Sequence, residues 1–236
     1  MRILITGATT SLAQILAATL RDTHQVRLTD HDALSTDLAF VESELGHDES
    51  TDSLVKDIDA IVHQAYVPRP GEDETTWLDR NSRCIYNLLL AASEAAVEHF
   101  VLLSTLDLFA PYDADMAVSE TWKPLPSCEP TNLGAHLAEF TASEFSHSHA
   151  LQVTIARLGH LAREAETGQE PYDPIWLDER DAAQAVGQIL EKGAALRASR
   201  YSVVHIQSDS ARARFTIGKA KSLLGFSPQY NFEINP

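Results

Sequence analysis

The sequence predicts an α/β protein built on a doubly wound parallel sheet. Apolar stretches of strand length alternate with amphipathic stretches of helix length along most of the 236 residues. The chain opens with a strand, a turn that begins with Gly7 and a helix, which together form the first unit of a dinucleotide-binding fold. Strands that alternate with helices of this length are typical of right-handed crossovers, and therefore of a parallel sheet.

The elements are predicted from runs and spacing of apolar residues. A strand is predicted at residues 1–6 from the apolar run Ile3, Leu4 and Ile5. Apolar residues then recur at helical spacing from Leu12 to Leu20. Further strands are predicted at 25–29, 57–64, 99–105, 153–158 and 201–206. Further helices are predicted at 77–96, 130–146, 178–192 and 216–224, the last ending at Gly225. Proline, glycine and acidic residues mark loops at 68–75, 111–130 and 162–174.

Length and composition bound the classes of function. The chain fits one domain, residues 1–236, and its net charge of −16 repels nucleic acid and anionic membranes. The acidic surface favours solubility, and a cationic partner or a saline environment is the alternative. No apolar run reaches a membrane span, and Met1 leads straight into the first strand, so we expect a cytoplasmic protein. Cys84 and Cys128 lack metal-ligand spacing and are expected to be reduced thiols, with no metal site.

Ligands of a doubly wound sheet bind at the carboxyl ends of its strands. In this chain those ends are predicted at Gly7, Asp30, Ala65, Thr105 and Gly159. These positions are therefore where binding and chemistry are expected.

Five segments, in order and spacing, resemble landmarks of one enzyme family. They are "TGATTSLA" from Thr6, "DAIVHQAY" from Asp59, "NSRCIYNLLLAA" from Asn81, "HFVLLSTLDLFA" from His99 and "SETWKPLPSCEPTNLGAHLAE" from Ser119. With them the chain resembles the extended short-chain dehydrogenase/reductases, also called NAD-dependent epimerase/dehydratases. The resemblance covers nearly the whole chain. It implies a Rossmann-like sheet that binds a nicotinamide dinucleotide, with a reduced C-terminal substrate lobe at 159–177 and 207–236.

The phosphate-binding turn departs from the family pattern. Gly7 keeps the first glycine of the fingerprint, whereas Thr10 and Ala13 stand where the second and third would be. If the position of Thr10 needs a positive φ, a β-branched residue costs about 1–2 kcal/mol there. Its side chain would also crowd the phosphates.

Several groups at this turn still favour an anion. The helix start offers amides at Ser11 and Leu12 and a partial positive charge. The hydroxyls of Thr9, Thr10 and Ser11 could replace lost backbone contacts. We therefore expect dinucleotide binding, and the alternative is that these residues only cap the helix.

The other cofactor contacts are predicted from the strand ends. Asp30 can accept hydrogen bonds from the adenosine ribose and would repel a 2′-phosphate, which favours NAD over NADP; the alternative is a surface aspartate in a turn. The resemblance places Glu44 and Leu45 beside the adenine. The end of the third strand is expected to line the cofactor with Gln64, Ala65 and Tyr66.

The catalytic pattern is broken at two positions. The resemblance implies a serine or threonine, which is Thr105, and a Tyr-x-x-x-Lys pair in which the lysine favours a phenolate whose pKa is ordinarily about 10. Leu133 and Leu137 stand at the tyrosine and lysine positions. Leucines at i and i+4 on a helix fit core packing and cannot transfer a proton. Standard catalysis is therefore not expected.

Three functions remain open. The first is a dinucleotide-dependent sensor or partner-binding protein. The second is an oxidoreductase or epimerase with a relocated base, for which His136 is the main candidate and Asp107 and Tyr112 are others. The third is a scaffold that binds no nucleotide. Because only residues 160–175 separate Gly159 from Trp176, a small-molecule ligand is favoured over a nucleotide sugar.

The resemblance also implies self-association. Family members commonly pair through two helices, which are 77–96 and 130–146 in this chain, as a four-helix bundle. Small residues on the first of these helices would allow close approach: Ala91, Ala92, Ala95 and Ala96. We therefore expect a homodimer.

Overall fold

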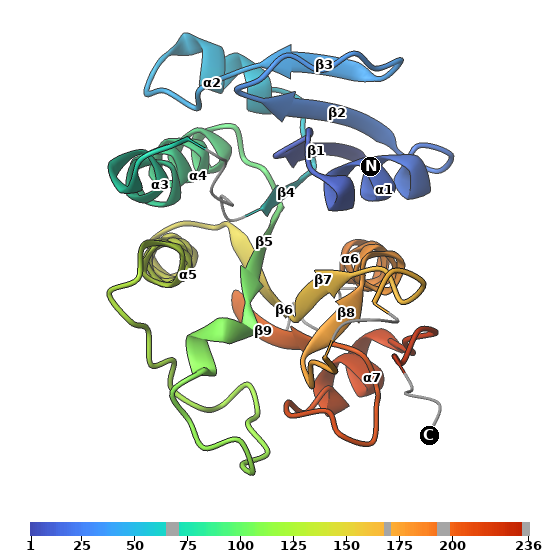
Figure 1. The fold of residues 1–236 in the computed structure, drawn as a ribbon. Coiled ribbons are helices and arrows are strands. Elements are labelled where there is room, and N and C mark those ends of the chain that lie inside the picture. The colour runs from blue at the N-terminus through green and yellow to red at the C-terminus, as the bar shows by residue number, and fades with distance from the viewer. Residues whose placement is uncertain (65–70, 168–170, 193–198, 233–236) are drawn as a thin grey trace.

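A computed structural model describes residues 1–64, 71–167, 171–192 and 199–232 and contains a seven-stranded sheet (Figure 1). Its strand order is β3-β2-β1-β4-β5-β6-β9, and every neighbouring pair is parallel. The strands are β1 (Arg2–Thr6), β2 (Gln25–Asp30), β3 (Ala39–Glu42), β4 (Ala60–Gln64), β5 (His99–Thr105), β6 (Gln152–Leu158) and β9 (Tyr201–Ile206). This order is that of a doubly wound dinucleotide-binding sheet and confirms the predicted fold class.

Helices cover both faces of the sheet (Figure 1). One face carries α1 (Ser11–Leu20), α6 (Glu179–Lys192) and α7 (Gly218–Leu224). The other carries α2 (Glu49–Val55), α4 (Ile85–Glu94) and α5 (Pro130–Ser148).

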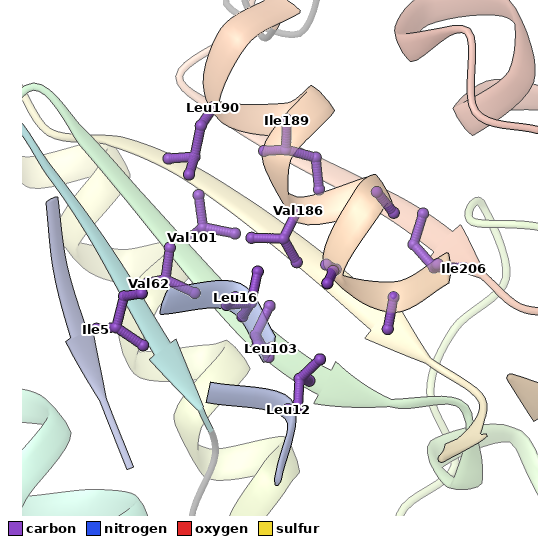
Figure 2. Close-up of a cluster of buried hydrophobic side chains, with 14 of the residues drawn as sticks. Ile5, Leu12, Leu16, Val62, Val101, Leu103, Val186, Ile189, Leu190 and Ile206 are labelled. Atoms are coloured by element: carbon purple, nitrogen blue, oxygen red, sulfur yellow. The ribbon is translucent and has the colours of Figure 1, made fainter. Parts of the chain in front are cut away.

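Strand alternation divides the core into two clusters. On β5, Val101 and Leu103 face α1 and α6, whereas Phe100 and Leu102 face α4 and α5. Figure 2 shows the first cluster, in which side chains of α6 lie over those of the strands and of α1. Because the central strands are buried on both faces, they read in the sequence as continuous apolar runs.

The predicted helix at 77–96 is longer at its start and irregular. Helix α3 (Glu74–Asp79) begins after the N-cap Asp73, and a π-helical turn η1 (Arg80–Cys84) joins it to α4. Asn81 in this turn packs against α5 so closely that a Cβ added at Gly134 would lie 3.0 Å from its side-chain nitrogen.

Smaller elements were missed or misplaced by the sequence prediction. The edge strand β3 and the seven-residue helix α2 were not predicted. Strand β4 begins three residues later than expected, because Asp57 turns the chain with a φ of 59°. Helix α7 likewise begins at Gly218 rather than at residue 216.

A small unit lies beside the carboxyl ends of β5 and β6. It comprises the 3₁₀ turn η2 (Leu106–Phe109) and two short parallel strands, β7 (His160–Ala162) and β8 (Trp176–Asp178). A Cβ added at Gly159 would meet the carbonyl oxygen of Ile175 at 2.1 Å, so only glycine allows this close approach. Among the described residues, no helix is long and apolar enough to cross a membrane.

One buried ion pair fixes α5 against the sheet. Arg157 of β6 donates two hydrogen bonds to Glu139 of α5, at 2.9 and 2.7 Å, and both side chains are about 95% buried, with 4% and 5% exposed. The pair holds the helix that borders the β5 strand end.

We predict that Glu139→Ala destabilises the fold by about 3–5 kcal/mol, because it leaves the Arg157 charge buried without a partner. The control is Asp79→Ala, which breaks the exposed Asp79–Arg83 pair on α3 and η1 and should cost less than about 1 kcal/mol. Urea denaturation measures both. Equal losses in the two variants would contradict the importance assigned to the buried pair.

Candidate functional site

Two depressions lie along the carboxyl edge of the sheet. The first, here called the β1–β2 cleft, is lined by residues that include Gly7, Asp30 and Leu45. The second, the β5–β6 pocket, has a volume of about 550 Å³ and contains Thr105 and His160. Gln64, at the end of β4, lines both, so the two depressions adjoin.

The turn from β1 to α1 is built without strain at Thr10. Gly7 alone in this turn has a left-handed φ, of 66°, whereas Thr10 is extended, with φ −77° and ψ 151°. Thr10 is the N-cap of α1, and its hydroxyl accepts a hydrogen bond from the amide of Ala13. The cost expected for a β-branched residue at a positive φ therefore does not arise.

The Thr10 hydroxyl is also bonded within the turn and to the end of β4. Its hydroxyl lies 2.8 Å from both the Gly7 carbonyl oxygen and Gln64 Oε1. The amides of Ser11 and Leu12, in the first turn of α1, have no carbonyl one turn before them, as at any helix start. These two amides are therefore available to donate to an anion.

All three hydroxyls expected to contact phosphate are already engaged. Thr9 donates to Asp30 Oδ2 at 2.7 Å, Thr10 is bonded within the turn, and Ser11 donates to Glu179 Oε2 at 2.8 Å. The hydroxyls thus order the turn, and the backbone amides are left for the ligand.

Asp30 is buried at the end of β2 with 5% of its surface exposed. Its Oδ2 accepts the amide and hydroxyl of Thr9, at 2.9 and 2.7 Å. Its Oδ1 accepts the amide of His31 and lies 2.9 Å from the His31 ring. The carboxylate is therefore fixed facing the turn, and a ribose hydroxyl would have to share or replace one of these donors.

The far end of the cleft is set by the loop after β3. Leu45 is buried, with a φ of 51°, and its carbonyl accepts a hydrogen bond from Asn87 of α4 at 2.9 Å. Glu44 pairs with Arg80 at 3.3 Å. Both predicted residues thus line the cleft, whereas Ala65 and Tyr66 lie outside the described residues. Burial lowers the pKa of His63 to about 4, as suits a packed strand residue.

Thr105 lies at the end of β5 and begins η2. Its hydroxyl donates to Asp107 Oδ2 at 3.0 Å and accepts the Asp107 amide at 3.0 Å. Asn132, from the first turn of α5, donates to the Asp107 carbonyl oxygen at 3.0 Å. These contacts fix the side chains of Thr105 and Asp107, which both line the β5–β6 pocket.

His160 lies between two carboxylates in this pocket. Its Nε2 is 2.8 Å from Asp107 Oδ1, and its Nδ1 is bonded to Asp173 Oδ2. The hydrogen bond to Asp107, and then that to Asp173, raise the pKa of His160 to about 9 against the opposing effect of burial. The same hydrogen bond lowers the pKa of Asp107. At neutral pH the group is an imidazolium held by two carboxylates.

The residues singled out on α5 lie elsewhere. This helix lines the pocket with Thr131, Asn132 and Ala135. His136, Leu133 and Leu137 are half-buried and do not line it. A catalytic role for His136 therefore stays a prediction without support from the pocket.

Of the other sequence candidates, Asp107 reaches the pocket and Tyr112 does not. The Tyr112 hydroxyl donates to the Lys123 carbonyl oxygen at 2.9 Å. His160 was missed, although it directly follows the predicted strand end Gly159, which was the one signal available. Among the described residues, no group of three or more His, Cys, Asp or Glu side chains is arranged to hold a metal ion.

Comparison with known proteins identifies the class. A model of the NAD dependent epimerase/dehydratase family matches residues 3–172, and the chain belongs to this family. It is 24% identical over 253 residues to the NAD-dependent glucose-6-phosphate dehydrogenase of Haloferax volcanii, with 97% of this chain and 93% of that protein covered.

Solved structures share the fold. A mutant of Agrobacterium tumefaciens uronate dehydrogenase complexed with NAD has a TM-score of 0.81 at 18% identity, covering 97% of this chain and 84% of that one. The UDP-glucuronic acid 4-epimerase of Bacillus cereus in complex with NAD has a TM-score of 0.79 at 19% identity, covering 98% and 95%.

NAD is the cofactor of this family, and the β1–β2 cleft fits it. Gly7 makes the tight turn, the amides of Ser11 and Leu12 would hold the diphosphate, and Asp30 would hold the ribose. Bound there, NAD would supply a hydride acceptor.

We predict that Asp30→Asn weakens NAD binding about tenfold and removes the preference for NAD over NADP. The reason is that the variant lacks both the anionic acceptor and the repulsion of a 2′-phosphate. Melting temperatures with each of the four oxidised and reduced dinucleotides measure the preference, and Asp22→Asn, at the other end of α1, is the control. Retention of the wild-type preference by Asp30→Asn would contradict the role of this carboxylate.

Proposed function

We propose that this protein is an NAD-dependent oxidoreductase or epimerase that acts on a small hydroxyl or carbonyl substrate in the β5–β6 pocket. The observation that carries the proposal is the hydrogen-bonded series Thr105, Asp107 and His160, which lies in a pocket that adjoins the NAD cleft through Gln64. The Asp107–His160 pair takes the place of the family's tyrosine and lysine as the acid–base group.

Each residue of the series has a chemical task. When a carbinol is oxidised, a hydride leaves the carbon for bound NAD, a proton leaves the hydroxyl, and a C=O bond forms. Thr105 is placed to hold the substrate oxygen. Asp107 Oδ2 accepts the hydroxyl proton once the substrate takes the place of the Thr105 hydrogen bond.

His160 then accepts the proton from Asp107. It is bonded to the other oxygen of the same carboxylate, and 45% of its side chain is exposed, so it exchanges protons with water. The pair accepts a new proton only when His160 has lost its own. Oxidation therefore needs neutral His160, and reduction needs the imidazolium.

The substrates named for similar proteins suggest a first screen. They are glucose 6-phosphate and uronates, and the chain should be assayed with these, with unphosphorylated aldoses and with small alcohols by the absorbance of NADH. NAD-dependent turnover of one of them is the expected result. Binding of NAD with no turnover across the panel would contradict the oxidoreductase proposal.

A dinucleotide-dependent sensor or partner-binding protein is the second candidate. The resemblance that puts Leu133 and Leu137 at the tyrosine and lysine positions favours it, because neither side chain can support the family's usual proton transfer. This protein would bind NAD without turning over a substrate.

We predict that the rate of oxidation rises with pH toward about 9, the pKa of His160. Below this pH the imidazolium cannot take the proton from Asp107, and above it the rate levels off. His160→Gln should remove this rise of kcat with pH. The control variant His47→Gln, which changes an exposed histidine, should keep it. An unchanged rise in His160→Gln would contradict the assignment.

We also propose that the protein forms a homodimer through α3–α4 and α5. Two large aromatic side chains are exposed on these helices, Tyr86 at 48% and Phe140 at 59%. Phe140→Ser should shift the mass measured by light scattering from dimer to monomer, whereas Leu223→Ser on α7 should not. A wild-type monomer at micromolar concentration would contradict the proposal.

A further inference from the structure

An ion pair from the C-terminal half reaches the first residue of α1. Arg163, directly after β7, donates from Nε to Glu179 Oε2 at 2.9 Å, and the Ser11 hydroxyl donates to the same oxygen at 2.8 Å. The side chains of Arg163 and Glu179 are 30% and 14% exposed. Two hydrogen bonds thus connect a guanidinium to the start of the helix whose amides face the diphosphate.

This carboxylate has an electrostatic consequence for the NAD cleft. A diphosphate carries two negative charges, and Glu179 adds a third one hydrogen bond away from Ser11. Without a cation the carboxylate would oppose the favourable field of the helix start. Arg163 supplies that cation at the same oxygen atom.

The Arg163 guanidinium also has N–H groups that do not bond to Glu179. Among the residues that the structure describes, only its Nε–H has a hydrogen-bond partner, which leaves the Nη groups available. A planar guanidinium can donate two parallel hydrogen bonds to a phosphate.

Arg163 and His160 lie at opposite ends of the short strand β7. His160 at the first residue of this strand lines the β5–β6 pocket, and Arg163 follows its last residue. The diphosphate of NAD joins the adenosine of the β1–β2 cleft to the nicotinamide beside that pocket. A dinucleotide that joined the two depressions would pass the start of α1, to which Glu179 and Ser11 connect Arg163.

We propose that Arg163 binds the diphosphate of NAD and that Glu179 positions its guanidinium for this contact. The inference rests on the NAD binding on which the proposed function depends, and it does not require turnover. It assigns a cofactor contact to the C-terminal half of the chain, far in sequence from the β1–α1 turn.

Calorimetric titration with ADP, NAD and adenosine tests the assignment. Arg163→Gln should raise the Kd of ADP and of NAD about three- to tenfold, as expected for one charge several ångströms from the phosphates, and leave that of adenosine unchanged. It should also reduce the salt dependence of ADP binding. Glu179→Gln keeps an oxygen that accepts from Arg163 and should lower the Kd of ADP about threefold, because it removes a negative charge.

Arg21→Gln is the matched control, because it breaks an ion pair with Asp37 at the other end of α1. It should change none of the three affinities. Equal ADP affinity in wild type and Arg163→Gln, or an equal loss for ADP and adenosine, would overturn the assignment of Arg163 alone. Failure of the wild-type protein to bind either NAD or ADP would overturn the NAD site itself, and with it this inference.

Discussion

The whole carboxyl edge of the sheet depends on the turn that joins β1 to α1. Gly7 takes the one left-handed conformation, and Thr10 closes the turn by capping the helix. Thr9 then donates to Asp30 of β2, and Thr10 contacts Gln64 of β4. Thr9 and Thr10 together therefore connect the ends of β1, β2 and β4. The first amides of the helix have no carbonyl partner one turn before them.

A second constraint acts at β5 and β6. The close approach at Gly159 lets β7 leave the sheet beside Ile175, and this brings His160 against Asp107. The two carboxylates stabilise the charged imidazole and hold it in the β5–β6 pocket, which Thr105 also lines.

The fold followed from the sequence because its central strands are buried on both faces. Val101 and Phe100, which face opposite layers, are both apolar, so β5 reads as one continuous run. Strand β3 lacks this signal because it lies at the sheet edge and is mostly exposed. Helix α2 has only seven residues, too few to establish a clear helical period.

The sequence predicted which residues at strand ends line the two depressions, but not those positioned by tertiary contacts. Asp30, Gln64 and Thr105 each end a predicted strand, and each lines one of the depressions or both. The pKa of His160 is raised by Asp107, which is 53 residues away, and by Asp173 in a loop. The spacing of these residues in the sequence does not indicate that they are in contact. The Arg163–Glu179 pair depends in the same way on how β7 lies against α6.

The central claim is that the amides of Ser11 and Leu12 receive a diphosphate although Thr10 caps the helix. A crystal structure grown with saturating NAD tests it most directly. The account predicts density for the diphosphate at the start of α1, for the ribose beside Asp30, and for the nicotinamide toward Thr105 and His160. A cleft without this density, with the Thr10 side chain turned across the start of the helix, would contradict it.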